Sequence, residues 1–296
     1  MRDTEYYNVY EEIKSVARMI YRNISEIELR SPNYVPIIKD KTVYYGGNQI
    51  WFSSNYKTSS DYIIHHYGCG TIATADLILY LGIKNNIYRN AVTESVLQGT
   101  DSGYYIDYMS YVRKINTYYT KTKRYIAVLG PRIALAFNSY SKTYQFGLKA
   151  KWELKLSYYD MLEHIEEMLY YDMPVILSIG PNTPNLWGKK GIALYHRDII
   201  DQAIDITMKD NTFNQHVLYR FRPIRNNINS HYVTVTGIYR VEKTKHSSFD
   251  NKVNSKGEIM LQISSWGKLY YINYEEYRDY IDNFGGTFTS SIVYIK

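Results

Sequence analysis

Apolar positions recur along the first half of the chain at the spacing of a helix. This spacing predicts amphipathic helices over residues 10–21, 105–119 and 158–171. A further helix is expected to begin at Gly130-Pro131, because proline suits the first helical turn. Residues 67–82 are apolar on nearly every side and end at a glycine, which indicates a central, buried helix.

The second half changes to patterns typical of strands. Alternation, or a short apolar run bounded by turn residues, predicts strands at 174–180, 232–239, 258–264, 269–272 and 291–295. Two regions are less regular. The link from 181 to 230 is expected to hold a helix near 197–208. Residues 31–60 are expected to form an irregular, loop-rich region of short extended pieces and polar turns, because prolines and glycines interrupt them.

The order of these elements predicts the fold class. Helices first and strands later favour an α+β domain over a parallel α/β sheet. No clean boundary divides the chain, so we expect a single domain over 1–296. Its first part, 1–156, should be mainly helical, and its second part, 157–296, mainly β.

Composition narrows the class of protein. The chain has 296 residues, 45% hydrophobic and 22% charged, which is typical of a globular protein with a sizeable core. The net charge of +6 is spread along the sequence, so no nucleic-acid partner is expected. The longest apolar run, 72–81, is interrupted by Asp76, so no membrane span is expected either. The lack of a secretory signal and the single cysteine make the cytoplasm the default location.

The single cysteine lies where a loop is expected to become the buried helix. At a helix start, the thiolate of Cys69 would face free backbone N–H groups and the positive end of the helix dipole, which lowers a thiol pKa. Gly68 and Gly70 leave room for an electrophile, and the Cys69 N–H can point at a developing oxyanion. The alternative is that Cys69 is a small buried apolar residue.

A nucleophilic cysteine needs a base, and histidine is the usual one. Among the seven histidines, His231 directly precedes the strand predicted at 232–239, which would hold its imidazole rigidly at the end of a sheet. The other six lie in polar loops or within a helical pattern. His231 is therefore the best candidate for a general base.

Four motifs in one order resemble the papain-like cysteine peptidase superfamily, and most closely the bacterial peptidases related to double-glycine leader peptidases. The motifs are Gly68-Cys69-Gly70 at the start of an apolar helix, the strand Pro-Val-Ile-Leu-Ser-Ile, the segment Ser-His-Tyr-Val-Thr-Val-Thr-Gly, and Ser264-Ser265-Trp266-Gly267. The resemblance covers roughly residues 46–280. It implies a two-lobe fold in which the Cys69 helix packs against an antiparallel sheet that carries His231.

The resemblance also implies roles for individual residues. Cys69 would be the nucleophile, His231 the general base and acid, and Trp266 a cover over the histidine. The family has Asn or Asp before the Trp-Gly turn to orient the imidazole. Here Ser264 takes that position and brings no charge, and Asp250 is an alternative source of the missing carboxylate.

The oxyanion hole departs from the family pattern as well. Papain-like enzymes carry a glutamine a few residues before the cysteine, whereas the candidate here, Gln49, lies twenty positions upstream. Its side-chain amide has the donor needed to complement the Cys69 N–H. Asn48 is the second choice.

These observations favour a cysteine peptidase that cleaves peptide bonds of a peptide or protein substrate through an acyl-enzyme. Two alternatives remain open. An acyltransferase or transglutaminase-like enzyme would use the same residues, and a decayed peptidase fold would bind peptides or glycans through its 35 tyrosines. No cofactor is expected, and no metal site, because the one cysteine and the scattered histidines lack ligand spacing.

Overall fold

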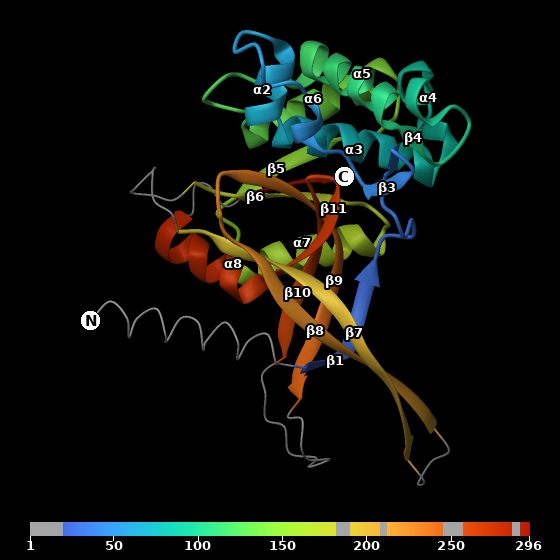
Figure 1. The fold of residues 1–296 in the computed structure, drawn as a ribbon, viewed down its shortest axis with the longest axis vertical. Coiled ribbons are helices and arrows are strands. Elements are labelled where there is room, and N and C mark those ends of the chain that lie inside the picture. Colours follow the sequence, from blue (N-terminus) through green and yellow to red (C-terminus); the bar gives the residue numbers. More distant parts are fainter. Residues whose placement is uncertain (1–19, 182–189, 208–211, 245–256, 286–290) are drawn as a thin grey trace.

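A layer of helices lies against one large antiparallel sheet (Figure 1). The computed structural model describes residues 20–181, 190–207, 212–244, 257–285 and 291–296. Helices and a nine-stranded sheet account for most of this part of the chain, so the α+β class is confirmed.

Most helices precede the long strands in the sequence and gather on one side of the sheet (Figure 1). The α-helices are α2 (Ser60–Tyr67), α3 (Cys69–Lys84), α4 (Ala91–Leu97), α5 (Tyr105–Ile115), α6 (Gly130–Thr143), α7 (Tyr158–Tyr170) and α8 (Tyr274–Tyr280). Single turns of 3-10 or π helix are η1 (Gln49–Trp51), η2 (Asn86–Tyr88), η3 (Asn116–Thr120) and η4 (Ile281–Gly285).

The large sheet has the strand order β1-β8-β7-β11-β10-β9-β6-β12-β5. Its strands are β1 (Ile20–Glu28), β5 (Ala150–Leu154), β6 (Val175–Ile179), β7 (Ile192–Thr207), β8 (Thr212–Ile228), β9 (His231–Thr244), β10 (Glu258–Ser265), β11 (Lys268–Asn273) and β12 (Ser291–Ile295). A small second sheet joins β2 (Pro36–Lys39), β3 (Thr42–Tyr45) and β4 (Gly103–Tyr104).

Strand β1 pairs with β9 as well as with β8, so six strands form a closed ring of antiparallel pairings. Strand β9 borders two apolar clusters, because its side chains alternate between the two faces of the sheet and a bulge at Thr236 shifts the alternation by one residue. Val235 and Ile238 belong to the main core, whereas Tyr239 and Val241 belong to a smaller cluster of residues from the ring strands. The guanidinium of Arg197 lies over three tyrosine rings of that smaller cluster.

Helix α3 is the centre of the main core. All of its residues from Cys69 to Gly82 are buried, as its nearly continuous apolar sequence predicts. It begins directly after α2, and Gly68 at the junction lies so close to helix α2 that an added Cβ would be 2.3 Å from the carbonyl oxygen of Ile64. The helix also passes through Gly82 and continues to Lys84.

One expectation from the sequence is wrong. The helix expected near 197–208 is not found, because residues 197–207 belong to strand β7, which pairs with β8 from Ile192 to Thr207. The apolar positions there have helical spacing by chance, and long-range pairing decides the structure. Region 31–60, expected to hold short extended pieces and polar turns, contains the short strands β2 and β3 and the turn η1. Of the helix expected over 10–21, only the last two residues lie within the described chain, and they begin β1.

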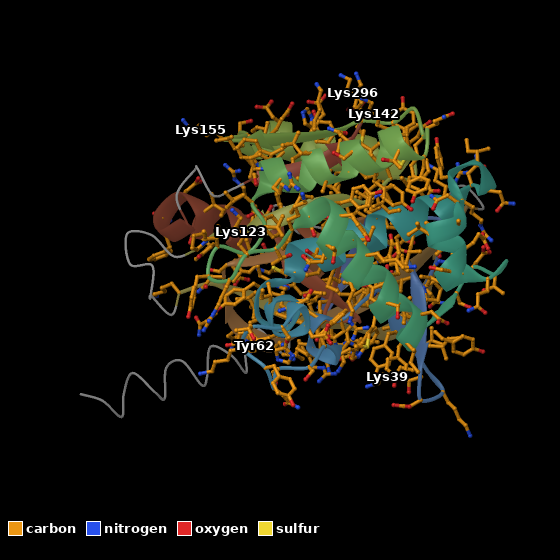
Figure 2. All side chains as sticks on the ribbon, turned by 90° about the horizontal axis from the view of Figure 1, so that it is seen from above. Lys39, Tyr62, Lys123, Lys142, Lys155 and Lys296 are labelled. Atoms are coloured by element: carbon orange, nitrogen blue, oxygen red, sulfur yellow. The ribbon has the colours of Figure 1, made fainter. Side chains whose placement is uncertain are left out.

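The lysines labelled in Figure 2 lie on different sides of the molecule. Lys142, Lys155 and Lys296 reach outward from one edge and Lys39 from the opposite edge. Across the described residues, no helix has both the length and the apolar character needed to cross a membrane.

Candidate active site

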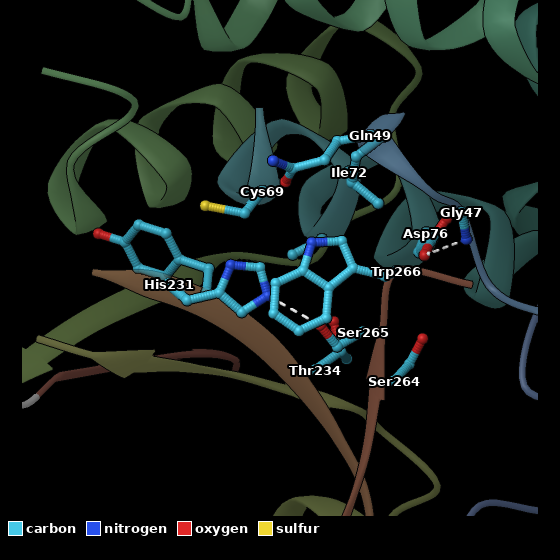
Figure 3. Close-up of a pocket in the computed structure, with 12 residues that line it drawn as sticks. Gly47, Gln49, Cys69, Ile72, Asp76, His231, Thr234, Ser264, Ser265 and Trp266 are labelled. Atoms are coloured by element: carbon cyan, nitrogen blue, oxygen red, sulfur yellow. Dashed lines mark hydrogen bonds between the residues drawn. The ribbon is translucent and has the colours of Figure 1, made fainter. Parts of the chain in front are cut away.

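The candidate residues meet where helix α3 packs against strand β9. Cys69 is the first residue of α3, and His231 is the first residue of β9. Both line one pocket, together with Gln49, Ser264 and Trp266 (Figure 3). The remaining lining residues are Gly47, Ile72, Ala73, Asp76, Tyr232, Thr234 and Ser265. Residues chosen from distant parts of the sequence therefore share one pocket.

The pocket is small, and the two candidate reacting residues in it are buried. Its volume is about 20 Å³, which is room for about one water molecule. Cys69 is 9% exposed and His231 is 8% exposed. The two glycines beside Cys69 contribute to this close packing, because a Cβ on Gly70 would meet the Tyr232 ring at 3.3 Å. They bring the helix against its neighbours rather than leaving an open approach to the sulfur.

The imidazole of His231 is held in one orientation by two neighbours. Its Nε2 hydrogen-bonds the hydroxyl of Ser265 at 2.7 Å. Its ring stacks on the indole of Trp266 with ring centroids 4.2 Å apart and planes 11° apart. The other ring nitrogen, Nδ1, lies on the side of the Cys69 side chain (Figure 3). This leaves Nδ1 as the nitrogen available to the thiol.

The expectation that Ser264 orients the histidine is wrong. Successive side chains of a strand point to opposite faces, and near the end of β10 it is Ser265 that reaches His231. The Ser264 hydroxyl donates instead to the backbone oxygen of Tyr45 at 2.7 Å. Asp250, the alternative source of a carboxylate, lies outside the described residues.

A tight hairpin places Trp266 over the imidazole. Ser265 and Lys268 pair across the turn, which leaves Trp266 and Gly267 as its two central residues. Their φ angles are 48° and 71°, the left-handed pair of a type I′ turn. This conformation is uncommon for a tryptophan. In this conformation the indole stacks on His231, and the guanidinium of Arg225 lies 4.7 Å from the indole ring.

Burial keeps both reacting groups neutral in the free protein. It raises the pKa of the Cys69 thiol, against the opposing effect of nearby backbone N–H groups, including that of Tyr232. The expected lowering by the helix start is therefore outweighed. Burial, together with the positive charge of Arg225, lowers the pKa of His231 to about 3. The pair rests as thiol and imidazole rather than as an ion pair.

Gln49 reaches the pocket from the turn η1. Asn48 caps this turn, with its side-chain oxygen accepting from the Ile50 N–H at 3.0 Å. The Gln49 side-chain nitrogen donates to the backbone oxygen of His65 at 2.9 Å, at the end of helix α2. One N–H of the amide is thereby used, and the second remains for an oxyanion near Cys69. Asn48 is committed to its cap, so Gln49 is the better donor of the two.

One further residue of the pocket lining, Asp76, is an acid within the apolar sequence of α3. Asp76 follows Cys69, Ile72 and Ala73 on the same face of α3, at the spacing i, i+3, i+4 and i+7. It is 2% exposed. A lone carboxyl in an otherwise apolar helix is the signal that could have identified it. Alternation along β10 shows that Ser264 and Ser265 face opposite sides of the sheet, but it does not show which of them meets His231.

Comparisons with protein-family models, with curated proteins and with solved structures find no match to this chain. Among the described residues, no group of three or more His, Cys, Asp or Glu side chains is placed to hold a metal ion.

Proposed function

We propose that this chain is a cysteine peptidase of papain-like architecture, which cleaves peptide bonds through a thioester on Cys69. The observation that carries the proposal is the single pocket lined by Cys69, His231 and Gln49. The hydrogen bond from His231 to Ser265 and the cover by Trp266 support it, because they orient the imidazole with one nitrogen toward the sulfur. The Cys69 helix packed on an antiparallel sheet is compatible with the two-lobe arrangement.

The neutral resting pair defines the first step. As the Cys69 sulfur attacks the peptide carbonyl carbon, its proton passes to Nδ1 of His231, and the carbonyl oxygen becomes an oxyanion. The Cys69 N–H and the Gln49 amide donate to that oxyanion. The Trp266 face and the Ser265 hydroxyl stabilise the imidazolium that forms, while Arg225 opposes it.

The remaining steps return the enzyme to its starting state. The tetrahedral intermediate collapses, the C–N bond breaks, and the leaving amine takes the proton from His231. Water then attacks the thioester while His231 removes its proton, and the carboxylic product leaves as the thiol is restored. An amine in place of water would give the acyl-transfer reaction with the same residues.

The single cysteine makes a test possible without knowledge of the substrate. The probe is p-nitrophenyl acetate, which acylates a working nucleophile, and acyl transfer to Cys69 is followed by nitrophenol release and by protein mass. We expect His231→Ala to slow acylation by about 10²-fold or more, the contribution of a general base. Equal acylation rates for wild type and His231→Ala would contradict the proposal and favour a binding protein.

A further inference from the structure

The carboxyl of Asp76 contacts the segment that leads to Gln49. Its Oδ2 accepts from the backbone N–H of Gly47 at 2.9 Å, and its Oδ1 accepts from the hydroxyl of Tyr108 at 2.7 Å. Tyr108 belongs to helix α5, so Asp76 joins three separate parts of the chain. Each oxygen of the buried carboxyl has one donor.

Among the described residues, no cation forms an ion pair with this carboxyl. The titratable groups that face it there are the phenols of Tyr34, Tyr108 and Tyr111. The pKa of each of these tyrosines is raised, by burial first and then by neighbours that include Asp76. Burial raises the pKa of Asp76 itself to about 7, although both hydrogen bonds oppose this. An uncompensated buried acid lowers the free energy of unfolding, and such unfavourable groups concentrate at functional sites.

The turn beside Asp76 has no side chains of its own to separate it from the carboxyl. Gly46 has a φ of 88°, and a Cβ there would be 2.6 Å from Ser264 Oγ and 2.7 Å from Asp76 Oδ2. A Cβ on Gly47 would be 1.8 Å from the Tyr108 hydroxyl. Both glycines are therefore required by the contact with Asp76 and Tyr108.

The same turn sets the position of Gln49. Gly47 is followed by Asn48, which caps η1, and Gln49 is the first residue of that single helical turn. A shift of the Gly47 backbone would move Gln49 relative to Cys69. Figure 3 shows the Gly47–Asp76 hydrogen bond on one side of the pocket and Gln49 above the Cys69 side of it.

We propose that Asp76 is a positioning residue, which holds the Gly46-Gly47 turn so that the Gln49 amide faces the oxyanion formed at Cys69. This inference rests on the proposed function, because it assigns Gln49 to the oxyanion. Asp76 touches no reacting atom in this role. Its carboxyl acts only through the turn.

The experiment compares two reactions of the single cysteine in the full chain. Acylation by p-nitrophenyl acetate forms an oxyanion, whereas alkylation by iodoacetamide does not. We expect Asp76→Ala to slow acylation by about 10²-fold, as loss of one oxyanion donor does, and to change alkylation by no more than about threefold. Asp76→Asn keeps an acceptor for Gly47 and should stay within about tenfold of wild type, the effect of about 1 kcal/mol.

Two control variants test whether slower acylation reflects a general loss of structure. Tyr108→Phe removes only the second hydrogen bond and should slow acylation by about tenfold or less. Tyr80→Phe removes a comparable bond, from a tyrosine hydroxyl to Asp172, away from the pocket, and should leave acylation unchanged. The double variant Asp76→Ala with Gln49→Ala should be no slower than Gln49→Ala alone, because both changes remove the same donor.

Hydrogen exchange reads the position of the turn independently of activity. Amide exchange over residues 46–50 should become faster in Asp76→Ala and stay unchanged in Tyr80→Phe. Unchanged exchange in Asp76→Ala, additive losses in the double variant, or equal losses of acylation and alkylation would overturn the positioning role. A wild type that does not acylate would refute the proposed function instead, while the exchange result would still decide whether Asp76 holds the turn.

Discussion

Helix α3 carries two tyrosine–aspartate contacts that differ in their charge balance. Midway along it, Asp76 accepts from Tyr108 and from the backbone of Gly47. Near its end, Tyr80 donates to Asp172, which follows helix α7. Both aspartates are buried, at 2% and 4% exposure. The two sites thus have the same hydrogen-bond chemistry in the same core.

The difference lies in what neutralises each carboxylate. Asp172 has the ammonium group of Lys84 at 3.9 Å and also accepts from the backbone N–H of Arg30. It joins the segment after β1, the end of α3 and the end of α7, so it is a structural link. Asp76 has no cation within the described chain and faces the pocket. Removing one partner of a buried charge pair destabilises the fold, whereas an unpaired buried charge reduces stability by itself and is retained where function needs it.

The largest expected effect separates the two aspartates by stability. At pH 8, Asp172→Ala should lower the free energy of unfolding by about 3–5 kcal/mol, because Lys84 and two donors lose their partner. Asp76→Ala should cost less than about 2 kcal/mol, because the loss of two hydrogen bonds is offset by the removal of an uncompensated charge. Urea denaturation measures both values.

Asp172→Asn is the control for backbone strain. The φ of Asp172 is 58°, a left-handed conformation that asparagine tolerates better than alanine. The asparagine variant should recover part of the loss. Equal destabilisation by Asp172→Ala and Asp76→Ala would show that Lys84 makes no difference to the two sites.

The next effect is a pH dependence of stability in which two opposing contributions cancel. The pKa of Asp76 is raised to about 7, so its contribution to the free energy of unfolding falls as pH rises from about 4 to about 7, because only the folded state holds the proton. The pKa of His231 is lowered to about 3, so its contribution to the free energy of unfolding rises as pH rises from about 3 to about 6.5, because only the unfolded state holds the proton. Between pH 4 and 6.5 the two contributions cancel.

Removing either group should expose the contribution of the other. Relative to wild type, Asp76→Asn should gain about 1.4 kcal/mol of stability per pH unit as pH rises between about 4.5 and 6.5. His231→Asn should lose about the same amount per unit over that range. Urea denaturation at three pH values measures the slopes, with Asp172→Asn as a carboxyl variant outside the pocket. Parallel slopes for Asp76→Asn and His231→Asn would rule out the opposing pKa shifts.

Much of the fold follows from local patterns in the sequence. The apolar run after Gly68 forms α3, and the alternating residues after His231 form β9. Cys69 and His231 could both be singled out because each lies at the end of such an element. The strand β7 could not be identified this way, because its apolar spacing fits a helix and its pairing with β8 depends on distant residues.

The site is less predictable than the fold because it depends on packing between distant segments. The choice between Ser264 and Ser265 depends on which face of β10 meets His231, and only the register of the sheet decides that. The protonation of Cys69 depends on burial, which outweighs the helix start visible in the sequence. Asp76 was visible only as a charge within an apolar run, and its contact with Gly47 joins residues 29 positions apart.

The smallest expected effects distinguish these two neighbouring serines. Ser265→Ala removes one neutral hydrogen bond from His231, so p-nitrophenyl acetate acylation should fall by about tenfold, the equivalent of about 1.4 kcal/mol. Ser264→Ala removes a bond to Tyr45 beside the Gly46-Gly47 turn, so it should have a similar or smaller effect on the same rate.

Background variants tell the two serines apart, because each serine acts through a different residue. In a His231→Ala background, Ser265→Ala should have no further effect on acylation, whereas Ser264→Ala should keep its own effect. In a Gln49→Ala background the pattern should reverse, because Ser264 supports the same turn as Asp76. If Ser264→Ala instead became silent only in the His231→Ala background, then Ser264 would act through the histidine, and the orientation of the imidazole by Ser265 would have to be abandoned.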